Sequence, residues 1–158
     1  MRLILLKIMG QSLVKNYIHL VFSTKYRQPL IFPPVEQELH AYLGGLCNQI
    51  DCQVLAVGGY TDHIHILFDL SKKIPLMVAV QKIKGNSSKW IKNRFPDLQH
   101  FYWQDGYGAF SVNPRQVDVV IDYIKNQHAH HREKSFKAEY RASLMRNRIE
   151  FDERYVWD

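Results

Sequence analysis

The segment QVLAVGGYTDHIHILFDL, residues 53–70, contains two stretches of apolar and β-branched residues separated by a short polar turn. We predict strands at Gln53–Val57 and His63–Leu70, with Gly58-Gly59 and Thr61-Asp62 forming the turn. Strands joined by so short a connection are expected to pair as neighbours in one sheet. This hairpin is therefore the point from which the rest of the fold can be placed.

The sequence on both sides of the hairpin alternates between strand-like and helix-like patterns. In chain order, the other predicted elements are a strand at 17–23, a helix at 35–50, a helix at 75–95, a strand at 109–112, a helix at 113–131 and a basic amphipathic segment at 136–149. The order β-α-β-β-α-β predicts an α+β, ferredoxin-like fold with an antiparallel sheet and appended C-terminal helices. Because this fold has many unrelated functions, the function must be argued from individual residues.

Length and composition limit the class of protein. A chain of 158 residues that is 46% hydrophobic and 23% charged is typical of one globular domain, which excludes disordered, collagen-like and membrane-embedded classes. We treat 1–158 as a single domain, with 1–9 as an N-terminal extension and 132–158 as a basic helix and tail. The net charge of +6 favours a polyanionic partner such as nucleic acid. Two cysteines form no disulfide framework, and no apolar run is long enough for a membrane span, so we expect a cytoplasmic protein.

The His63-Ile64-His65 motif lies at the start of the predicted third strand. Residues two apart on a strand project from the same face, so both imidazoles can bind one divalent ion. Paired histidines also occur as ordinary surface or hydrogen-bonded core residues. The following Ile66-Leu67-Phe68 makes the strand otherwise apolar, so polar groups there need a partner.

Tyr123 and Gln127 lie one turn apart on the predicted helix at 113–131. They flank an apolar arc that is expected to pack on the domain, which makes them half-buried neighbours at the same junction. Taken alone, this is also the pattern of a packing tyrosine beside a hydrogen-bonding amide.

The two motifs, taken together in their order along the chain, resemble those of a known protein family. Asp62-His63-Ile64-His65-Ile66-Leu67, followed by Tyr123-Ile124-Lys125-Asn126-Gln127 and then His130-His131, resembles the single-tyrosine transposases of small bacterial insertion sequences, members of the HUH nuclease superfamily. The resemblance extends over nearly the whole chain, from Tyr17 to Trp157. It implies that His63, His65 and Gln127 are metal ligands and that Tyr123, on an appended helix, is the nucleophile.

The resemblance also implies a reaction and partners. The expected reaction is cleavage and rejoining of single-stranded DNA at insertion-sequence ends through a 5′-phosphotyrosine intermediate, with Mg²⁺ or Mn²⁺ as cofactor. Two imidazoles and an amide oxygen suit this chemistry, because they leave coordination positions open for a phosphate oxygen. The implied partners are single-stranded DNA with hairpins and a second copy of the chain, whose tyrosine helix can complete the histidine site of the first.

Basic residues with interspersed aromatics are candidates for DNA contact. They crowd the helix predicted at 75–95 and follow the tyrosine helix: Lys82, Lys84, Lys89, Trp90, Lys92, Arg94 and Arg132. Each of them can equally belong to a solvated surface. His130 and His131 are expected to be solvated or packing residues, and a role in proton transfer or DNA contact is the alternative. His19 is a candidate partner of the histidine pair.

Two alternatives to the transposase remain open at this stage. One is a host-adopted tyrosine nickase acting on palindromes, which the DNA flanking the gene would distinguish. The other is a non-catalytic, ferredoxin-like protein that binds single-stranded nucleic acid. Such modules present exposed aromatics on their central strands, whereas the third strand here presents His63 and His65.

Overall fold

The computed structural model describes residues 10–131 and 134–158. The expected extension at 1–9 and the candidate DNA-contact residue Arg132 lie outside the described residues. The strands are β1 (Tyr17–Ser23), β2 (Gln53–Tyr60), β3 (His63–Asp69) and β4 (Gly108–Val112), and the α-helices are α2 (Val35–Gln49), α3 (Leu76–Arg94), α4 (Val117–Lys125), α5 (Gln127–His130) and α6 (Phe136–Arg146). None of the helices in the described ranges combines the length and apolarity needed to cross a bilayer.

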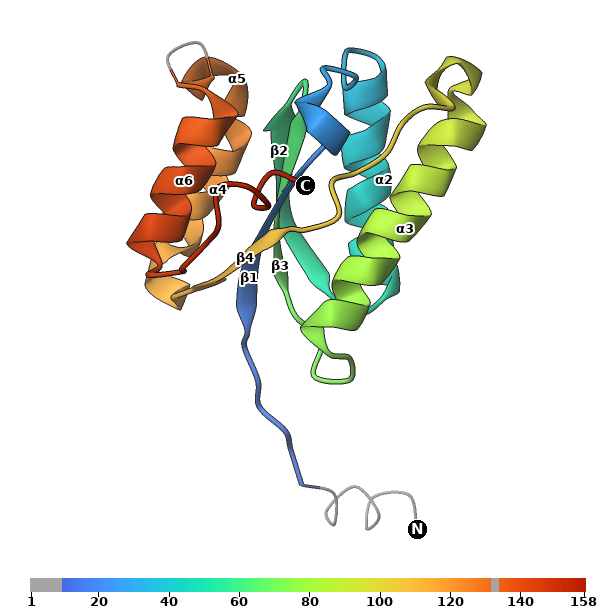
Figure 1. The fold of residues 1–158 in the computed structure, drawn as a ribbon. Coiled ribbons are helices and arrows are strands. Elements are labelled where there is room, and N and C mark those ends of the chain that lie inside the picture. The colour runs from blue at the N-terminus through green and yellow to red at the C-terminus, as the bar shows by residue number, and fades with distance from the viewer. Residues whose placement is uncertain (1–9, 132–133) are drawn as a thin grey trace, which may run out of the picture.

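The four strands form one antiparallel sheet in the order β2-β3-β1-β4. Helices α2 and α3 cover one face of this sheet, and α4, α5 and α6 lie on the other (Figure 1). The expected ferredoxin-like α+β fold is confirmed, and its first and third strands, β1 and β3, lie at the centre of the sheet.

Strand β3 is buried on both faces because each face carries a helical layer. Ile64, Ile66 and Phe68 belong to the main core against α2 and α3. By the alternation of a strand, His63, His65 and Leu67 point to the opposite layer, where Leu67 packs on Ile124 of α4. The histidine pair is therefore enclosed between the sheet and the C-terminal helices.

Two predicted element boundaries are wrong. Strand β2 continues to Tyr60, so Gly58 and Gly59 lie in the strand instead of the turn. They serve close backbone contact, because a Cβ at Gly58 would lie 2.2 Å from the carbonyl oxygen of Ile124. The predicted helix at 113–131 is also interrupted: it begins as a 3₁₀ turn at Pro114–Gln116, and α4 and α5 are separated at Asn126.

Helix α6 covers the part of the sheet that α4 leaves open. Ser135 caps its N-terminus by accepting a hydrogen bond from the Ala138 amide. Phe136, Tyr140 and Leu144 then pack against β1 and β4 in a second hydrophobic cluster. The chain finally returns to the loop before β4, where the Gly106 amide donates a hydrogen bond to the Asp158 carbonyl.

Candidate active site

His63 and His65 are buried at the start of β3, with side-chain exposures of 0% and 2%. The neighbours of His65 across the sheet are Gly58 of β2 and Val21 of β1, neither of which is large. The absence of a side chain at Gly58 is also what allows the backbone of α4 to approach the sheet at this level. The sheet register therefore brings the tyrosine helix next to the histidine pair.

A hydrogen bond at Nδ1 orients each imidazole. His63 Nδ1 lies 2.7 Å from Asp62 Oδ1, and His65 Nδ1 lies 2.8 Å from His19 Nε2. When Nδ1 carries the proton in such a pair, the Nε2 lone pair is free to bind a metal. The Asp62 carboxylate favours this form of His63, and His19 favours it for His65 when His19 Nε2 is the acceptor.

Burial keeps several of these imidazoles neutral. Desolvation and neighbouring histidines hold the pKa of His65 well below 6.5, and desolvation lowers the pKa of His131 to about 4. Burial also lowers the pKa of His19, with His65 adding to the effect. Because only neutral imidazole coordinates a metal, these residues are available as ligands at neutral pH.

Tyr123 and Gln127 reach the histidine pair from the last turn of α4 and the start of α5. Gln127 Oε1 lies 3.0 Å from His63 Nε2, and the Tyr123 ring centroid lies 5.6 Å from that of His65. The Gln127 amide also donates to the Tyr123 carbonyl at 3.3 Å. All four residues that the sequence singled out therefore converge within a single chain.

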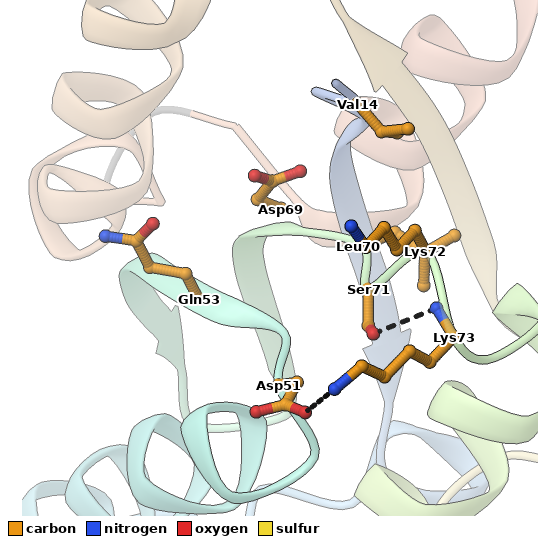
Figure 2. A pocket seen from close by; sticks show the side chains of 8 residues that line it. All are labelled: Val14, Asp51, Gln53, Asp69, Leu70, Ser71, Lys72 and Lys73. Carbon is orange, nitrogen blue, oxygen red and sulfur yellow. Dashed lines mark hydrogen bonds and ion pairs between the residues drawn. The ribbon is translucent and has the colours of Figure 1, made fainter. Parts of the chain in front are cut away.

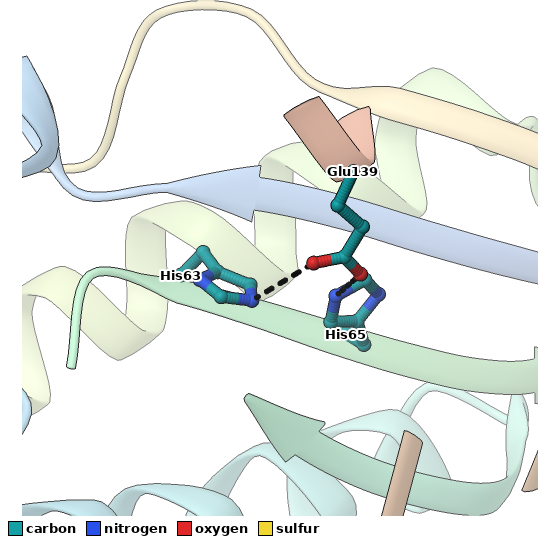
Figure 3. A group of neighbouring side chains, drawn as sticks. All are labelled: His63, His65 and Glu139. Carbon is teal, nitrogen blue, oxygen red and sulfur yellow. Dashed lines mark ion pairs between the residues drawn. The ribbon is translucent and has the colours of Figure 1, made fainter. Parts of the chain in front are cut away.

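Glu139 of α6 is a further member of the site that the sequence did not indicate. Its carboxylate reaches down to the histidine pair (Figure 3), with Oε1 3.0 Å from His65 Nε2 and Oε2 3.9 Å from His63 Nε2. The Tyr123 hydroxyl donates a hydrogen bond to Oε1. Burial raises the pKa of this carboxyl to about 7. A signal was present, because Glu139 is an acidic residue on the apolar face that Phe136 and Tyr140 define.

His131 also belongs to the cluster, so of the two expectations, solvated or packing, the solvated one is wrong. Its Nε2 lies 2.9 Å from Gln127 Oε1 and contacts Glu139, and its side chain is 3% exposed. Burial follows from the position of α6, which closes over the end of α5. Solvent exposure could not be judged from the sequence without knowing that position.

The donor atoms fit a divalent cation. One ligand atom from each of His63, His65 and Glu139 lies within 4.8 Å of the other two. Among the described residues, His65 Nε2 is buried without a hydrogen-bond partner, although it lies 3.0 Å from Glu139 Oε1. A cation between these groups would satisfy that nitrogen and balance the buried carboxylate.

The candidate DNA-contact residues of α3 lie on the other side of the sheet from this cluster (Figure 1). Lys84 Nζ donates to the carbonyls of Gln104, Asp105 and Gly106 at 2.6–3.0 Å, so it fixes a loop. The Trp90 ring stacks on Tyr42 of α2 at 4.6 Å. The positions of the remaining residues are as follows: Lys82 and Lys89 are exposed, Arg94 pairs with Glu38, and Lys92 lies over the Tyr102 ring. A DNA contact on α3 stays a prediction.

A shallow pocket of about 300 Å³ lies at the opposite end of β3 from the histidines (Figure 2). Asp69, Lys72 and Lys73 are among the residues that line it, and Lys73 pairs with Asp51 at 3.4 Å. Its opposite charges neutralise one another at an exposed surface. Distance from the cluster and paired charges exclude it from the candidate active site.

The antiparallel sheet carries a His-x-His pair on a central strand beside a tyrosine-bearing helix, and this is the arrangement that the resemblance to transposases implies. The chain belongs to the IS200-like transposases, whose family model, "Transposase IS200 like", matches residues 12–127. Glu139 and the whole of α6 lie beyond the matched region.

Individual relatives agree with this assignment. The chain is 29% identical over 114 residues to the transposases of insertion sequence IS200 from Salmonella typhimurium and Salmonella typhi, covering 69% of this chain and 74% of each relative. Two solved structures share the fold. A crystal structure of a candidate transposase from Deinococcus radiodurans has a TM-score of 0.62 at 24% identity, covering 75% of this chain and 96% of that one. A REP-associated tyrosine transposase bound to a REP hairpin has a TM-score of 0.57 at 14% identity, covering 78% and 73%.

Proposed function

We propose that this IS200-like transposase cleaves and rejoins single-stranded DNA with Tyr123 as the nucleophile. The observation that carries the proposal is a shared neighbour: the Glu139 carboxylate contacts both the Tyr123 hydroxyl and His65 Nε2. A phenol, two histidines and a carboxylate thus meet in a buried site of a DNA-processing family. Such convergence of chemically active groups is expected of a catalytic site.

The proposed metal ligands are His63, His65 and Gln127, with Glu139 as a fourth. Two nitrogens and two oxygens suit Mn²⁺ or Mg²⁺ and leave coordination positions for phosphate oxygens. Bound there, the cation supplies Lewis-acid polarisation of the scissile phosphate. The carboxylate adds a negative charge that the sequence-based ligand set lacked.

In the proposed step, the Tyr123 oxygen attacks the scissile phosphorus and forms a 5′-phosphotyrosine bond. The P–O3′ bond breaks, and the leaving oxygen takes up a proton to become a free 3′-hydroxyl. The phenol proton leaves along the existing hydrogen bond to Glu139 Oε1. Ionising a free phenol at pH 7 costs about 4 kcal/mol, so an acceptor already in place lowers the barrier.

The proposed substrate is single-stranded DNA with a hairpin. The net charge of +6 supports a nucleic-acid partner, and one protein of the same fold is described as bound to a REP hairpin. A homodimer is also proposed for this family member, working in the cytoplasm. The contact of Tyr123 with His65 of its own chain supports assembly of the site within one copy.

The test uses a labelled single-stranded oligonucleotide from the DNA that flanks the gene, incubated with Mn²⁺ and resolved on a denaturing gel. The wild-type protein is expected to form a covalent adduct, which EDTA and Tyr123→Phe abolish. Tyr155→Phe is the matched control, because Tyr155 is 65% exposed in the C-terminal tail. DNA binding that survives EDTA without any cleavage would instead support a non-catalytic binding protein.

A further inference from the structure

His19 and His65 form a pair of imidazoles across the two central strands of the sheet. In the register of β1 and β3, His19 lies opposite Leu67, two residues from His65. Both imidazoles therefore project from the face that the C-terminal helices cover. His19 Nε2 lies 2.8 Å from His65 Nδ1, and the ring centroids are 5.0 Å apart.

Both imidazoles of this pair are neutral. Burial holds the pKa of His19 and that of His65 well below 6.5, and the neighbouring Arg146 lowers the pKa of His19 further. A neutral imidazole has one N–H donor and one bare acceptor nitrogen. The shared hydrogen bond therefore has two arrangements, in which the proton between the rings belongs either to His65 Nδ1 or to His19 Nε2.

The role of His65 as a ligand allows only one of these arrangements. Coordination takes up the lone pair of His65 Nε2, so the proton of His65 has to lie on Nδ1. His19 Nε2 is then the acceptor, and the proton of His19 has to lie on its own Nδ1. In the opposite arrangement His65 carries its proton on Nε2, which faces Glu139 Oε1 at 3.0 Å and has no lone pair left for a cation.

The surroundings of His19 permit the arrangement that coordination needs. The ring lines a cleft beside Tyr123, and no hydrogen bond joins its Nδ1 to another of the described residues. Water in that cleft can accept the Nδ1 proton. Edge-to-face contacts with Phe110 and Tyr123, at centroid distances of 6.1 and 6.2 Å, favour the ring position that keeps Nε2 towards His65.

The partner of the other histidine behaves differently. Asp62 Oδ1 lies 2.7 Å from His63 Nδ1, and an ionised carboxylate can only accept a hydrogen bond. Asp62 therefore fixes the proton of His63 on Nδ1 by itself. His19 can donate or accept, so the proton position of His65 depends on the proton position of His19.

We propose that His19 is a positioning residue of the metal site, which accepts the His65 Nδ1 proton at Nε2 and holds its own proton at Nδ1. Neither ring changes its charge between the two arrangements. The shared proton moves from His19 Nε2 to His65 Nδ1, His65 Nε2 gives one proton to water, and His19 Nδ1 takes one from water. This inference rests on the proposed function, because it takes His65 as a metal ligand, but it does not require Tyr123 to be the nucleophile.

The first test measures Mn²⁺ affinity without DNA, by electron paramagnetic resonance of the free ion. The proteins compared are the wild type, His19→Leu, His19→Gln and His100→Leu, each shown to be folded by thermal unfolding in EDTA. Leucine cannot accept the His65 proton, so His19→Leu is expected to raise the Kd for Mn²⁺ about 10- to 100-fold. The amide oxygen of His19→Gln can accept it, so this variant should lose clearly less. His100, exposed in the loop before β4, is the matched control and should leave the Kd unchanged.

The second test locates the protons directly in the wild-type protein. Long-range ¹H–¹⁵N spectra with saturating Mg²⁺ distinguish a protonated ring nitrogen from a bare one, and the His19→Gln spectrum assigns the His19 signals. We expect His19 to be neutral, with its proton on Nδ1 and a bare Nε2. A proton on His19 Nε2 would overturn the inference.

The affinity results also separate this inference from the proposed function. Equal Kd values for the wild type and His19→Leu, or a loss in His19→Gln as large as that in His19→Leu, would overturn the role of His19 and leave the metal ligands in place. A wild-type protein that binds no Mn²⁺ would remove the proposed metal site and this inference with it.

Discussion

Replacing Glu139 by Gln is expected to stabilise the metal-free protein at pH 8 and to weaken its response to metal. The side chain keeps its shape, and its amide oxygen can still accept the hydrogen bond from Tyr123. What is lost is a buried negative charge. A residue that stabilises the fold through ordinary packing would behave in the opposite way.

The magnitude follows from the raised pKa of the carboxyl. The pKa rises from 4.5 to about 7 on folding, and each unit is about 1.4 kcal/mol, so ionising the buried group costs about 3.5 kcal/mol. The folded protein holds this proton to higher pH than the unfolded chain does. The contribution of the Glu139 carboxyl to the free energy of unfolding is therefore fully present below pH 4.5 and is lost as the pH rises to about 7. We therefore expect Glu139→Gln to gain about 1–3 kcal/mol over the wild type at pH 8, but little at pH 4.5.

The assay is urea unfolding in EDTA at pH 4.5 and pH 8, followed by thermal unfolding with and without Mn²⁺. In Mn²⁺ the wild type is expected to gain stability, because the cation binds only the folded state. The variant should gain clearly less. A variant that is less stable than the wild type at pH 8 in EDTA, and that responds equally to Mn²⁺, would refute the reasoning.

Three further predictions concern the positions of the helices and the core. Gly58→Ala places a Cβ 2.2 Å from the Ile124 carbonyl, so urea unfolding should show a loss of about 1–3 kcal/mol in the free energy of unfolding and adduct formation should fall. Gly45→Ala is the control, because a Cβ there meets no atom within 4 Å, and it should retain its activity. Equal losses in both variants would argue against the close approach of α4. Ser135→Ala removes the cap of α6 and should cost about 1 kcal/mol, with a weaker Mn²⁺-induced thermal shift; an unchanged unfolding midpoint would contradict this. Burial raises the pKa of Cys47 to about 12, so its thiol should not react with a thiol reagent at pH 8 until denaturant is added, and rapid reaction of the folded protein would show that this part of the core is open.

Much of the fold followed from local pattern. The strand at Tyr17–Ser23 was predicted with the bounds that the structure has, because β-branched and aromatic residues are concentrated there. The glycines of β2 were misassigned because a sequence cannot distinguish a glycine needed for a turn from one needed for close contact. A residue without a side chain is required at position 58 because the backbone of Ile124 in α4, which is remote in the chain, lies against it.

In the candidate site, too, the residues with a local sequence pattern could be predicted, and the residue placed by tertiary packing could not. The histidine pair and the Tyr123–Gln127 pair have spacings that fix a shared face on one strand or one helix, so they could be predicted. Glu139 could not, because its place depends on how α6 packs over β1 and β4. An acidic residue on an apolar helix face indicates a buried carboxylate, but it does not identify what that carboxylate contacts.

The most direct test of the central claim is to map the covalent adduct by tandem mass spectrometry. The wild-type protein, Mn²⁺ and a cleavable single strand are combined, and the DNA-linked peptide is sequenced. The account predicts a phosphodiester-linked nucleotide on Tyr123, with no adduct when His63 and His65 are both replaced by Ala. A nucleotide on any other residue, or an undiminished adduct in the histidine variant, would contradict it.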